Sequence, residues 1–300
     1  MSTGQPRFSI ITPCLNRVEF MEQALASVRA QEFPDTEHIV VDGGSTDGTL
    51  EMLARAPGIT LISGPDRGMY DALNKGLRAS RGDYVGFLNS DDVYARGAFA
   101  AAHARLDASA LAAVAGNAEF FRGDAAGGEV VYRWCPDDAD LLTLATTLAP
   151  AMNAWFFRRT ALAALGEFDA DYRIAGDREF MLRFALAAPR CASVGALFYR
   201  YRQHQGSMTI GGGDPRVRAR MTDEHLAMTR RWLGRPGLPP RARALLRELR
   251  RRDTLDMAAR CAHAGEVRAL LRYAAAGTRH DPAWCLHFMV RAARSALGGP

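Results

Sequence analysis

Short apolar runs alternate with helical periodicity through the first 90 residues. Runs rich in β-branched and other apolar side chains predict strands at residues 8–12, closed by Pro13, and at 38–41, 59–62 and 84–88. Apolar positions at helical spacing predict helices at residues 18–31, 49–54 and 69–79, the second with Ser45 or Thr46 as its N-cap. This order predicts an α/β fold with a mostly parallel central sheet flanked by helices. Ligands of such sheets bind beyond the carboxyl ends of the strands.

The pattern is less regular from residue 95 onward. Helices are predicted at residues 98–106, 160–165 and 178–187, and strands at 110–118, 129–134, 154–157 and 192–201. Residues 122–128 are expected to form the tip of a hairpin. A glycine-rich loop at residues 209–215 precedes a helical, arginine-rich remainder. We therefore predict a first domain of residues 1–213 and a helical C-terminal extension of residues 214–300.

Composition excludes several classes of protein. Of the 300 residues, 48% are hydrophobic and 24% are charged, which excludes wholesale disorder and a coiled coil. Residues 141–157 come nearest to a membrane span but are interrupted by polar and small residues, so we interpret them as buried protein. The polar N-terminus leads straight into a strand, and we expect no signal peptide. The scattered cysteines indicate five buried thiols in a reducing compartment: Cys14, Cys135, Cys191, Cys261 and Cys285.

Charge differs between the two predicted parts. From Asp214 onward there are 18 arginines and 8 acidic residues, a net charge of +10, whereas the first 213 residues carry a net charge of −5. The only lysine is Lys75. The basic extension could bind an anionic membrane surface or form a solvated helical face. Aromatic residues between the arginines are sparse, so we expect no nucleic-acid binding.

Acidic residues follow two of the predicted strands. Asp91 and Asp92 come directly after the fourth strand, where they could bind Mg²⁺ or Mn²⁺ together with a diphosphate, or cap a following helix. Asp42 ends the second strand and could accept hydrogen bonds from a base or ribose, or cap the next helix. Asp177 precedes a helix and could cap it or act as a general base. His204 and Ser207 lie beside the glycine-rich loop, where a structural role and a phosphate contact both stay open.

Together these segments resemble family 2 glycosyltransferases with the GT-A fold over residues 8 to about 210. The resemblance is carried by FSIITPCLNR (8–17), HIVVDGGSTDGTLEML (38–53), DRGMYDALNKGLRASRGDYVGFLNSDD (66–92) and FFRRTALAALGEFDADYRIAGDREFMLRFA (156–185). Four ordered blocks are a specific signal. They are most similar to a bacterial polysaccharide-type subgroup with GMYDALNKG followed by FLNSDD.

The resemblance implies roles for individual residues. Asp42 would contact the nucleotide base in a pocket walled by Thr12 and Pro13, and Asp91 would face the ribose and diphosphate. Arg67 and Asp71 fall in a loosely matching segment that often helps to bind the nucleotide. The predicted metal ligand is Asp92, holding Mn²⁺ or Mg²⁺. The predicted catalytic base is Asp177, although Gly176 stands where the family usually has a first acid.

The implied reaction is an inverting, metal-dependent transfer of a sugar from a nucleotide-diphospho-sugar, with UDP-sugar favoured. The acceptor would be a hydroxyl of a glycan or lipid-linked molecule in cell-surface polysaccharide synthesis. Processive relatives carry Gln-x-x-Arg-Trp, but the segment around Trp232 lacks the glutamine, so a non-processive enzyme is expected. We expect a cytoplasmic protein, peripheral on the inner face of the membrane if the extension binds there.

Other readings are weaker. An aspartyl-phosphate hydrolase would need a DxD arrangement and a downstream lysine in the segment that begins at Asp42, and both are missing. A nucleotidyltransferase would need a glycine-rich basic loop after the first strand, which residues 14–17 do not provide. A non-catalytic GT-A-like glycan-binding or scaffold protein stays open as an alternative, because it would keep the fold but lose the dependence on a metal.

Overall fold

The computed structural model describes residues 4–138, 151–207, 215–279 and 281–296. The chain divides into two compact units, residues 1–212 and 213–300. Residues 209–214 of the predicted glycine-rich loop and residues 141–150 of the apolar segment lie outside the described residues. The sheet and every predicted site residue belong to the first unit.

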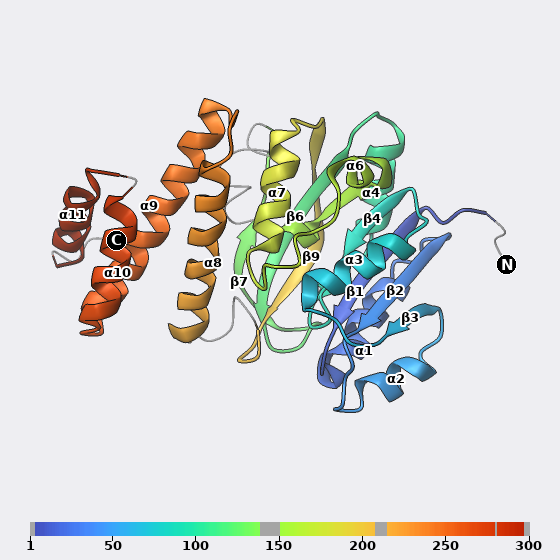
Figure 1. Ribbon diagram of the computed structural model, residues 1–300. Coiled ribbons are helices and arrows are strands. Elements are labelled where there is room, and N and C mark those ends of the chain that lie inside the picture. Colours follow the sequence, from blue (N-terminus) through green and yellow to red (C-terminus); the bar gives the residue numbers. More distant parts are fainter. Residues whose placement is uncertain (1–3, 139–150, 208–214, 280, 297–300) are drawn as a thin grey trace. The chain divides into compact units, whose positions relative to one another are not determined.

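One sheet runs through the described part of the first unit (Figure 1). Its strands are β1 (Phe8–Cys14), β2 (Thr36–Asp42), β3 (Ile59–Ser63), β4 (Tyr84–Phe87), β5 (Val93–Tyr94), β6 (Ala113–Arg122), β7 (Glu129–Trp134), β8 (Trp155–Arg158) and β9 (Cys191–Gln203). The order across the sheet is β3-β2-β1-β4-β8-β6-β9-β5, with β7 paired to β6.

Pairing differs between the two halves of this sheet. Strands β3, β2, β1 and β4 are parallel, so their carboxyl ends meet at one edge, as the sequence predicted. In the second half β6 and β9 are also parallel, but β8 runs antiparallel to β4 and β6. The expected hairpin is confirmed, because β6 and β7 pair antiparallel around residues 123–128.

Helices of the first unit pack on both faces of the sheet. They are α1 (Val18–Arg29), α2 (Thr49–Arg55), α3 (Met69–Ala79), α4 (Ala98–Asp107), α6 (Arg159–Leu165) and α7 (Gly176–Leu186), with a short 3₁₀ turn η1 (Met152–Ala154). Side chains alternate along β2: Val40 packs with α1 and α2, whereas Ile39 and Val41 pack with α3. This alternation is what a strand buried on both faces requires.

Two local expectations were wrong. Pro13 does not end the first strand, because β1 continues to Cys14 and pairs with β2 over its whole length. The N-cap of α2 is Gly48, at φ 95°, and not Ser45 or Thr46. Asp47 supplies the nearby acceptor instead, since its Oδ1 lies 3.0 Å from the backbone nitrogen of Thr49.

The second unit consists of helices in its described residues: α8 (Pro215–Leu233), α9 (Pro240–His263), α10 (Val267–Thr278) and α11 (Trp284–Ala296). Its apolar core gathers side chains from α9, α10 and the start of α11: Leu255, Met257, Ala258, Cys261, Tyr273 and Trp284. No helix among the described residues is long and apolar enough to span a membrane. The expectation that all five cysteines are buried was wrong, because Cys135 and Cys285 are exposed.

Candidate active site

Asp42 ends β2 in a fully buried position. Its carboxylate accepts hydrogen bonds from the backbone nitrogens of Gly44 (3.0 Å) and Ser45 (3.1 Å) and from the hydroxyl groups of Ser45 (2.5 Å) and Ser63 (3.1 Å). Burial opposes ionisation of Asp42, but these hydrogen bonds outweigh it and lower the pKa of the carboxyl. Both oxygens are therefore engaged in shaping the loop after β2. This leaves Asp42 poorly placed to receive a nucleotide base.

A second carboxylate lies beside the same strand end. A Cβ atom added to Gly43 would come within 2.6 Å of Asp66 Oδ2, so the glycine makes room for this side chain. Asp66 is half-buried, and its Oδ1 accepts a hydrogen bond from the backbone nitrogen of Gly68 at 2.8 Å. No described residue donates to its Oδ2. That oxygen is available to a ligand at the carboxyl edge of the sheet.

Thr12 and Pro13 are buried within β1 and do not present exposed side chains to this edge. The Thr12 hydroxyl lies 2.9 Å from Nε2 of His38, which belongs to the neighbouring strand β2. Burial lowers the pKa of His38 to about 3, so the imidazole is neutral at physiological pH. That Thr12 and Pro13 form a wall of a nucleotide pocket stays a prediction. In the structure, the partner of the Thr12 hydroxyl is a buried histidine.

Asp91 lies in the turn between β4 and β5, with its side chain 17% exposed. Its Oδ2 is 3.0 Å from Nε2 of His204, and no described residue donates to its Oδ1. The His204 ring packs on Phe20 with the ring centroids 4.5 Å apart. A carboxylate and an imidazole thus meet at the end of a strand, although 113 positions separate them in the chain.

Asp92 turns into the protein. Its Oδ1 accepts a hydrogen bond from the backbone nitrogen of Arg202 (2.7 Å), and its Oδ2 accepts from the Tyr199 hydroxyl (3.0 Å) and Asn89 Nδ2 (2.9 Å). Burial, and next the charge of Asp91, raise the pKa of Asp92 well above its usual range. Strand β5 follows directly, so neither acid caps a helix. These contacts anchor β9 to the turn and disfavour the predicted role of Asp92 as the metal ligand.

Asp177 lies in the first turn of α7, because this helix begins at Gly176, two residues earlier than the sequence predicted. The Tyr70 hydroxyl of α3 is 2.7 Å from the carbonyl oxygen of Ile174 and 3.3 Å from Asp177 Oδ1. A Cβ at Gly176 would lie 2.6 Å from the Tyr70 ring. The aromatic ring therefore occupies the space of the acid that is missing at position 176. The dipole of α7 favours an ionised carboxylate at Asp177.

Tyr201 is buried on β9, and its hydroxyl accepts a hydrogen bond from the backbone nitrogen of Asn153 at 3.2 Å. Burial raises the pKa of Tyr201, and the charges of Asp92 and of Asp177 raise it further. The acidic pair of the β4–β5 turn contacts β9 and its end, because Asp92 binds Tyr199 and Arg202 and Asp91 binds His204. Arg67, in contrast, is largely exposed and lies 3.8 Å from Asp71 as an ion pair.

Sequence analysis assigned no role to Asp66 or Tyr70. The Asp66 side chain lies against Gly43, which follows Asp42. The Tyr70 ring lies against Gly176, which precedes Asp177. The departure at Gly176 was visible in the sequence, but its consequence was not, because 106 positions separate it from Tyr70 along the chain. Only the fold shows that residues 66–70 lie against both the end of β2 and the start of α7.

The side chains at the end of β4 offer two candidate ligands for Mg²⁺ or Mn²⁺. Asp91 and His204 supply one carboxylate and one imidazole, and no cluster of three potential ligands occurs among the described residues. Mg²⁺ is commonly held by one or two protein groups, with substrate phosphates and water completing the shell. Imidazole is also compatible with first-row divalent ions. The pair therefore fits a metal that binds together with a diphosphate.

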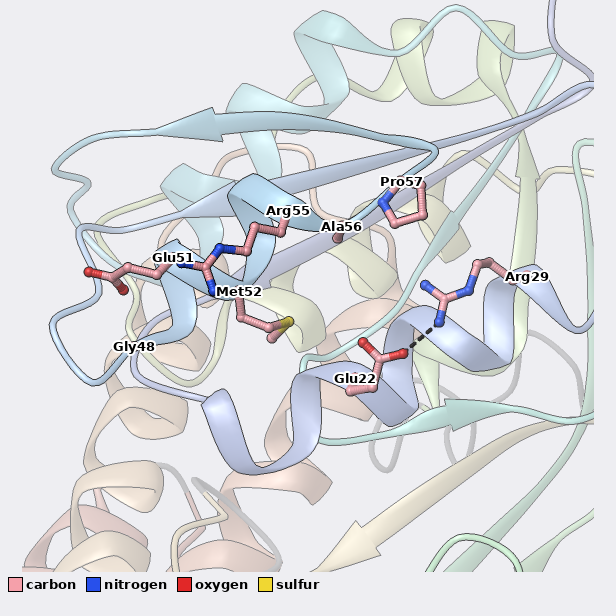
Figure 2. A pocket seen from close by; sticks show the side chains of 8 residues that line it. All are labelled: Glu22, Arg29, Gly48, Glu51, Met52, Arg55, Ala56 and Pro57. Atoms are coloured by element: carbon pink, nitrogen blue, oxygen red, sulfur yellow. Dashed lines mark hydrogen bonds and ion pairs between the residues drawn. The ribbon is translucent and has the colours of Figure 1, made fainter.

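A cavity of about 540 Å³ lies elsewhere, between α1 and α2 (Figure 2). It is lined by Glu22, Arg29, Gly48, Glu51, Met52, Arg55, Ala56 and Pro57. At the edge of the cavity, Arg29 Nη2 lies 2.6 Å from Glu22 Oε1, and the two side chains form an ion pair. None of the site residues described above lines this cavity, so we assign it no part in the chemistry.

Known proteins are similar in both sequence and fold. The family model for glycosyl transferase family 2 matches residues 9–166. An uncharacterized glycosyltransferase of Mycobacterium tuberculosis is 34% identical over 187 residues, which cover 61% of this chain and 71% of that protein. A PGL/p-HBAD biosynthesis glycosyltransferase of Mycobacterium bovis is 33% identical over 208 residues, with coverage of 65% and 73%.

The fold likeness extends further along the chain. The structure of S. aureus TarS in complex with UDP-GlcNAc superimposes with a TM-score of 0.69, covering 91% of this chain and 81% of that one. At 17% identity this likeness shows the fold and not the substrate. The GT-A fold expected from the sequence is thereby confirmed.

Proposed function

Because this chain belongs to glycosyl transferase family 2, and is therefore a glycosyltransferase, we propose that it moves a sugar from a nucleotide-diphospho-sugar to an acceptor hydroxyl with inversion. UDP-sugar is the favoured donor, and the reaction depends on Mn²⁺ or Mg²⁺. The acceptor is a glycan or lipid-linked molecule of cell-surface polysaccharide synthesis. Each catalytic cycle adds a single sugar.

The observation that carries this proposal is the Asp91–His204 pair at the carboxyl end of β4. Its 3.0 Å separation and partial exposure suit two ligands of one divalent ion next to a diphosphate. When bound, such an ion offsets the negative charge that develops on the departing nucleoside diphosphate. In this proposal Asp92 has a structural role. Its hydrogen bonds with Tyr199 and Arg202 hold the turn that carries Asp91.

Asp177 is proposed as the general base. Its carboxylate removes the proton of the acceptor hydroxyl while that oxygen attacks the anomeric carbon from the face opposite to the diphosphate. A single displacement of this kind inverts the anomeric configuration. The Tyr70 hydroxyl, 3.3 Å from Asp177 Oδ1, supports the orientation of the base. It fills the place of the missing acid at Gly176 without adding a second negative charge.

Asp66 is proposed as the acceptor for the nucleotide base in place of Asp42. Its free Oδ2 can accept the N3–H of uracil or thymine, or the N1–H of guanine, whereas N3 of cytosine carries no proton. Cytosine would instead present its exocyclic N4 amino group to the carboxylate, so a comparison of UDP with CDP reports which edge of the base Asp66 contacts. The arginine-rich extension, with its net charge of +10, is proposed to favour acceptors presented at an anionic membrane surface.

Calorimetric titration with UDP, GDP, dTDP and CDP, with and without Mn²⁺, tests the proposal. We expect UDP binding that requires Mn²⁺, is lost in Asp91→Asn and is retained in Asp92→Asn. Glu129→Gln is the matched control, because it removes an exposed carboxylate on β7 by the same conservative change. NMR of the sugar product then reports the anomeric configuration.

Three results would contradict the proposal. Loss of binding in Asp92→Asn with retention in Asp91→Asn would return the metal to Asp92. A retained anomeric configuration would exclude direct displacement assisted by Asp177. Absence of binding for all four nucleotides would favour the non-catalytic glycan-binding or scaffold protein.

A further inference from the structure

The second unit contains a buried arginine without an acidic partner. Arg250 of α9 is only 5% exposed. Its Nη1 donates to the carbonyl oxygen of Leu226 (2.9 Å) and to Thr229 Oγ1 (3.2 Å), and its Nε donates to the carbonyl oxygen of Ala276 (3.3 Å). Within the described part of the chain, Nη2 has no acceptor and no carboxylate pairs with this guanidinium. The two N–H groups of Nη2 are thus unpaired, on a guanidinium that three hydrogen bonds hold in place.

Arg250 lines a cavity of about 370 Å³ between α8, α9 and α10. Three more arginines line it, together with one acid and four apolar residues: Arg230, Arg272, Arg279, Asp223, Leu226, Ala227, Ala275 and Ala276. Asp223 is already engaged, since Arg272 lies 3.3 Å from its Oδ2 and the Tyr273 hydroxyl lies 3.1 Å from its Oδ1. Arg230 and Arg279 form no ion pair with any residue that the structure describes.

This grouping of like charges needs an explanation. Burial lowers the pKa of Arg250, and the charges of Arg230 and Arg279 lower it further, so the neighbourhood disfavours its cation. A buried charge is normally paired, because removing it from water is costly. A solvated basic face does not explain Arg250, whose guanidinium is withdrawn from solvent and fixed by two backbone carbonyl groups. An anion in the cavity would neutralise the excess charge.

We propose that this cavity binds a phosphate or diphosphate group of a ligand. Guanidinium groups bind such oxyanions through charge-assisted, often bidentate hydrogen bonds, and Arg250 presents a free Nη2 in a fixed orientation. Arg230 and Arg279 approach the same space from α8 and α10 and supply further donors. The apolar side chains of Leu226 and the three alanines suit an apolar group attached to the phosphate. The ligand is thus an anionic phosphate ester or diphosphate.

This site does not depend on the proposed sugar transfer. All its residues belong to the second unit, and its occupancy requires no divalent metal. A prenyl diphosphate, an anionic lipid headgroup and a free diphosphate share the chemistry that it recognises. They differ in whether an apolar chain or a bilayer contributes to binding, which an experiment can separate.

The test is calorimetric titration of the full-length protein with pyrophosphate and with farnesyl diphosphate in EDTA. Omission of metal suppresses the binding proposed at Asp91, and Asp91→Asn serves as a check. The test variant Arg230→Ala/Arg279→Ala removes two exposed arginines that line the cavity. The matched control, Arg247→Ala/Arg268→Ala, removes two exposed arginines of α9 and α10 that do not line it. Both variants lose the same charge, and thermal unfolding verifies that both fold.

We expect the test variant to weaken binding at least about tenfold, as expected for lost charged hydrogen bonds, while the control and Asp91→Asn bind like the parent protein. Tighter binding of farnesyl diphosphate than of pyrophosphate would identify a lipid-linked diphosphate. Binding only to vesicles that contain phosphatidylglycerol, again lost in the test variant, would identify a headgroup. Equal weakening in the control would show a diffuse basic surface and overturn the proposal, as would absence of binding to every probe.

Discussion

Acidification should destabilise this protein through His38, a histidine buried in β2 at only 4% exposure. Burial, and next the charge of Arg29, lower the pKa of His38 from 6.5 to about 3. Between these two values the unfolded chain binds a proton that the folded chain excludes. The contribution of neutral His38 to stability is therefore complete above pH 6.5 and is lost progressively as the pH falls toward 3.

The size of the effect follows from the same two values. Each pH unit below 6.5 costs about 1.4 kcal/mol, so at pH 5 the folded state loses about 2 kcal/mol relative to pH 8. The substitution His38→Gln removes the titrating group and keeps an amide near the Nε2 position, 2.9 Å from the Thr12 hydroxyl. We expect the variant to be less stable than the parent at pH 8, yet to lose about 2 kcal/mol less between pH 8 and pH 5.

Urea denaturation at pH 8, 6.5 and 5 measures this difference, and NMR titration of the His38 ring measures its pKa directly. His263→Gln is the control, since it makes the same change at an exposed histidine. The carboxylates that also titrate are common to parent and variants and cancel in the comparison. Equal pH dependence in the parent and in His38→Gln, or a His38 ring that titrates near pH 6.5 in the folded protein, would refute the reasoning.

Two further predictions concern the segment 66–70. Tyr70→Phe should lower kcat about 5- to 30-fold with little change in the KM of the donor, because it removes a hydroxyl worth about 1–2 kcal/mol beside Asp177; a change in KM alone in steady-state assays would contradict a positioning role. Gly43→Ala places a methyl group 2.6 Å from Asp66 Oδ2 and should weaken UDP binding while leaving the fold intact. The control is Gly127→Ala, because a methyl group at that position meets no atom within 4 Å. The neighbouring Gly44 is unsuitable as a control, because its φ of 94° would strain an alanine. Unchanged calorimetric affinity in Gly43→Ala would exclude Asp66 from the base site.

Several elements were accessible from local pattern alone. Residues 69–79 form a helix with the predicted ends, and β2 and β3 extend their predicted runs by one or two residues. The hairpin of β6 and β7 followed from a polar, glycine-containing turn between two strand-like runs. These features depend on side-chain periodicity and turn chemistry within about ten residues, and both can be read without knowing the fold.

The roles of adjacent acids were not accessible in this way. Asp91 and Asp92 are neighbours in the chain, yet one is partly exposed beside His204 and the other is buried against Tyr199 and Arg202. The resemblance to the family suggested Asp92 for the metal, and no local signal in the sequence distinguishes the two. Their difference arises from contacts with Tyr199 and Arg202 of β9 and with His204 just after it, which lie 107 to 113 positions further along the chain.

By itself, the sequence determined the alternation of strands and helices, the family, and the presence of acids at the carboxyl ends of β2 and β4. Tertiary structure decided which acids are enclosed by hydrogen bonds and which keep an oxygen without a donor. Asp42 is enclosed by hydrogen bonds from its own loop and from Ser63, and Asp66 takes the adjacent open position because residue 43 has no side chain. The second unit shows the same division: the sequence showed that it is rich in arginine, but only the packing of α8, α9 and α10 buries Arg250 without an acid. Secondary-structure propensity depends on the local sequence, whereas the burial and pairing of a side chain depend on which segments the fold brings next to it.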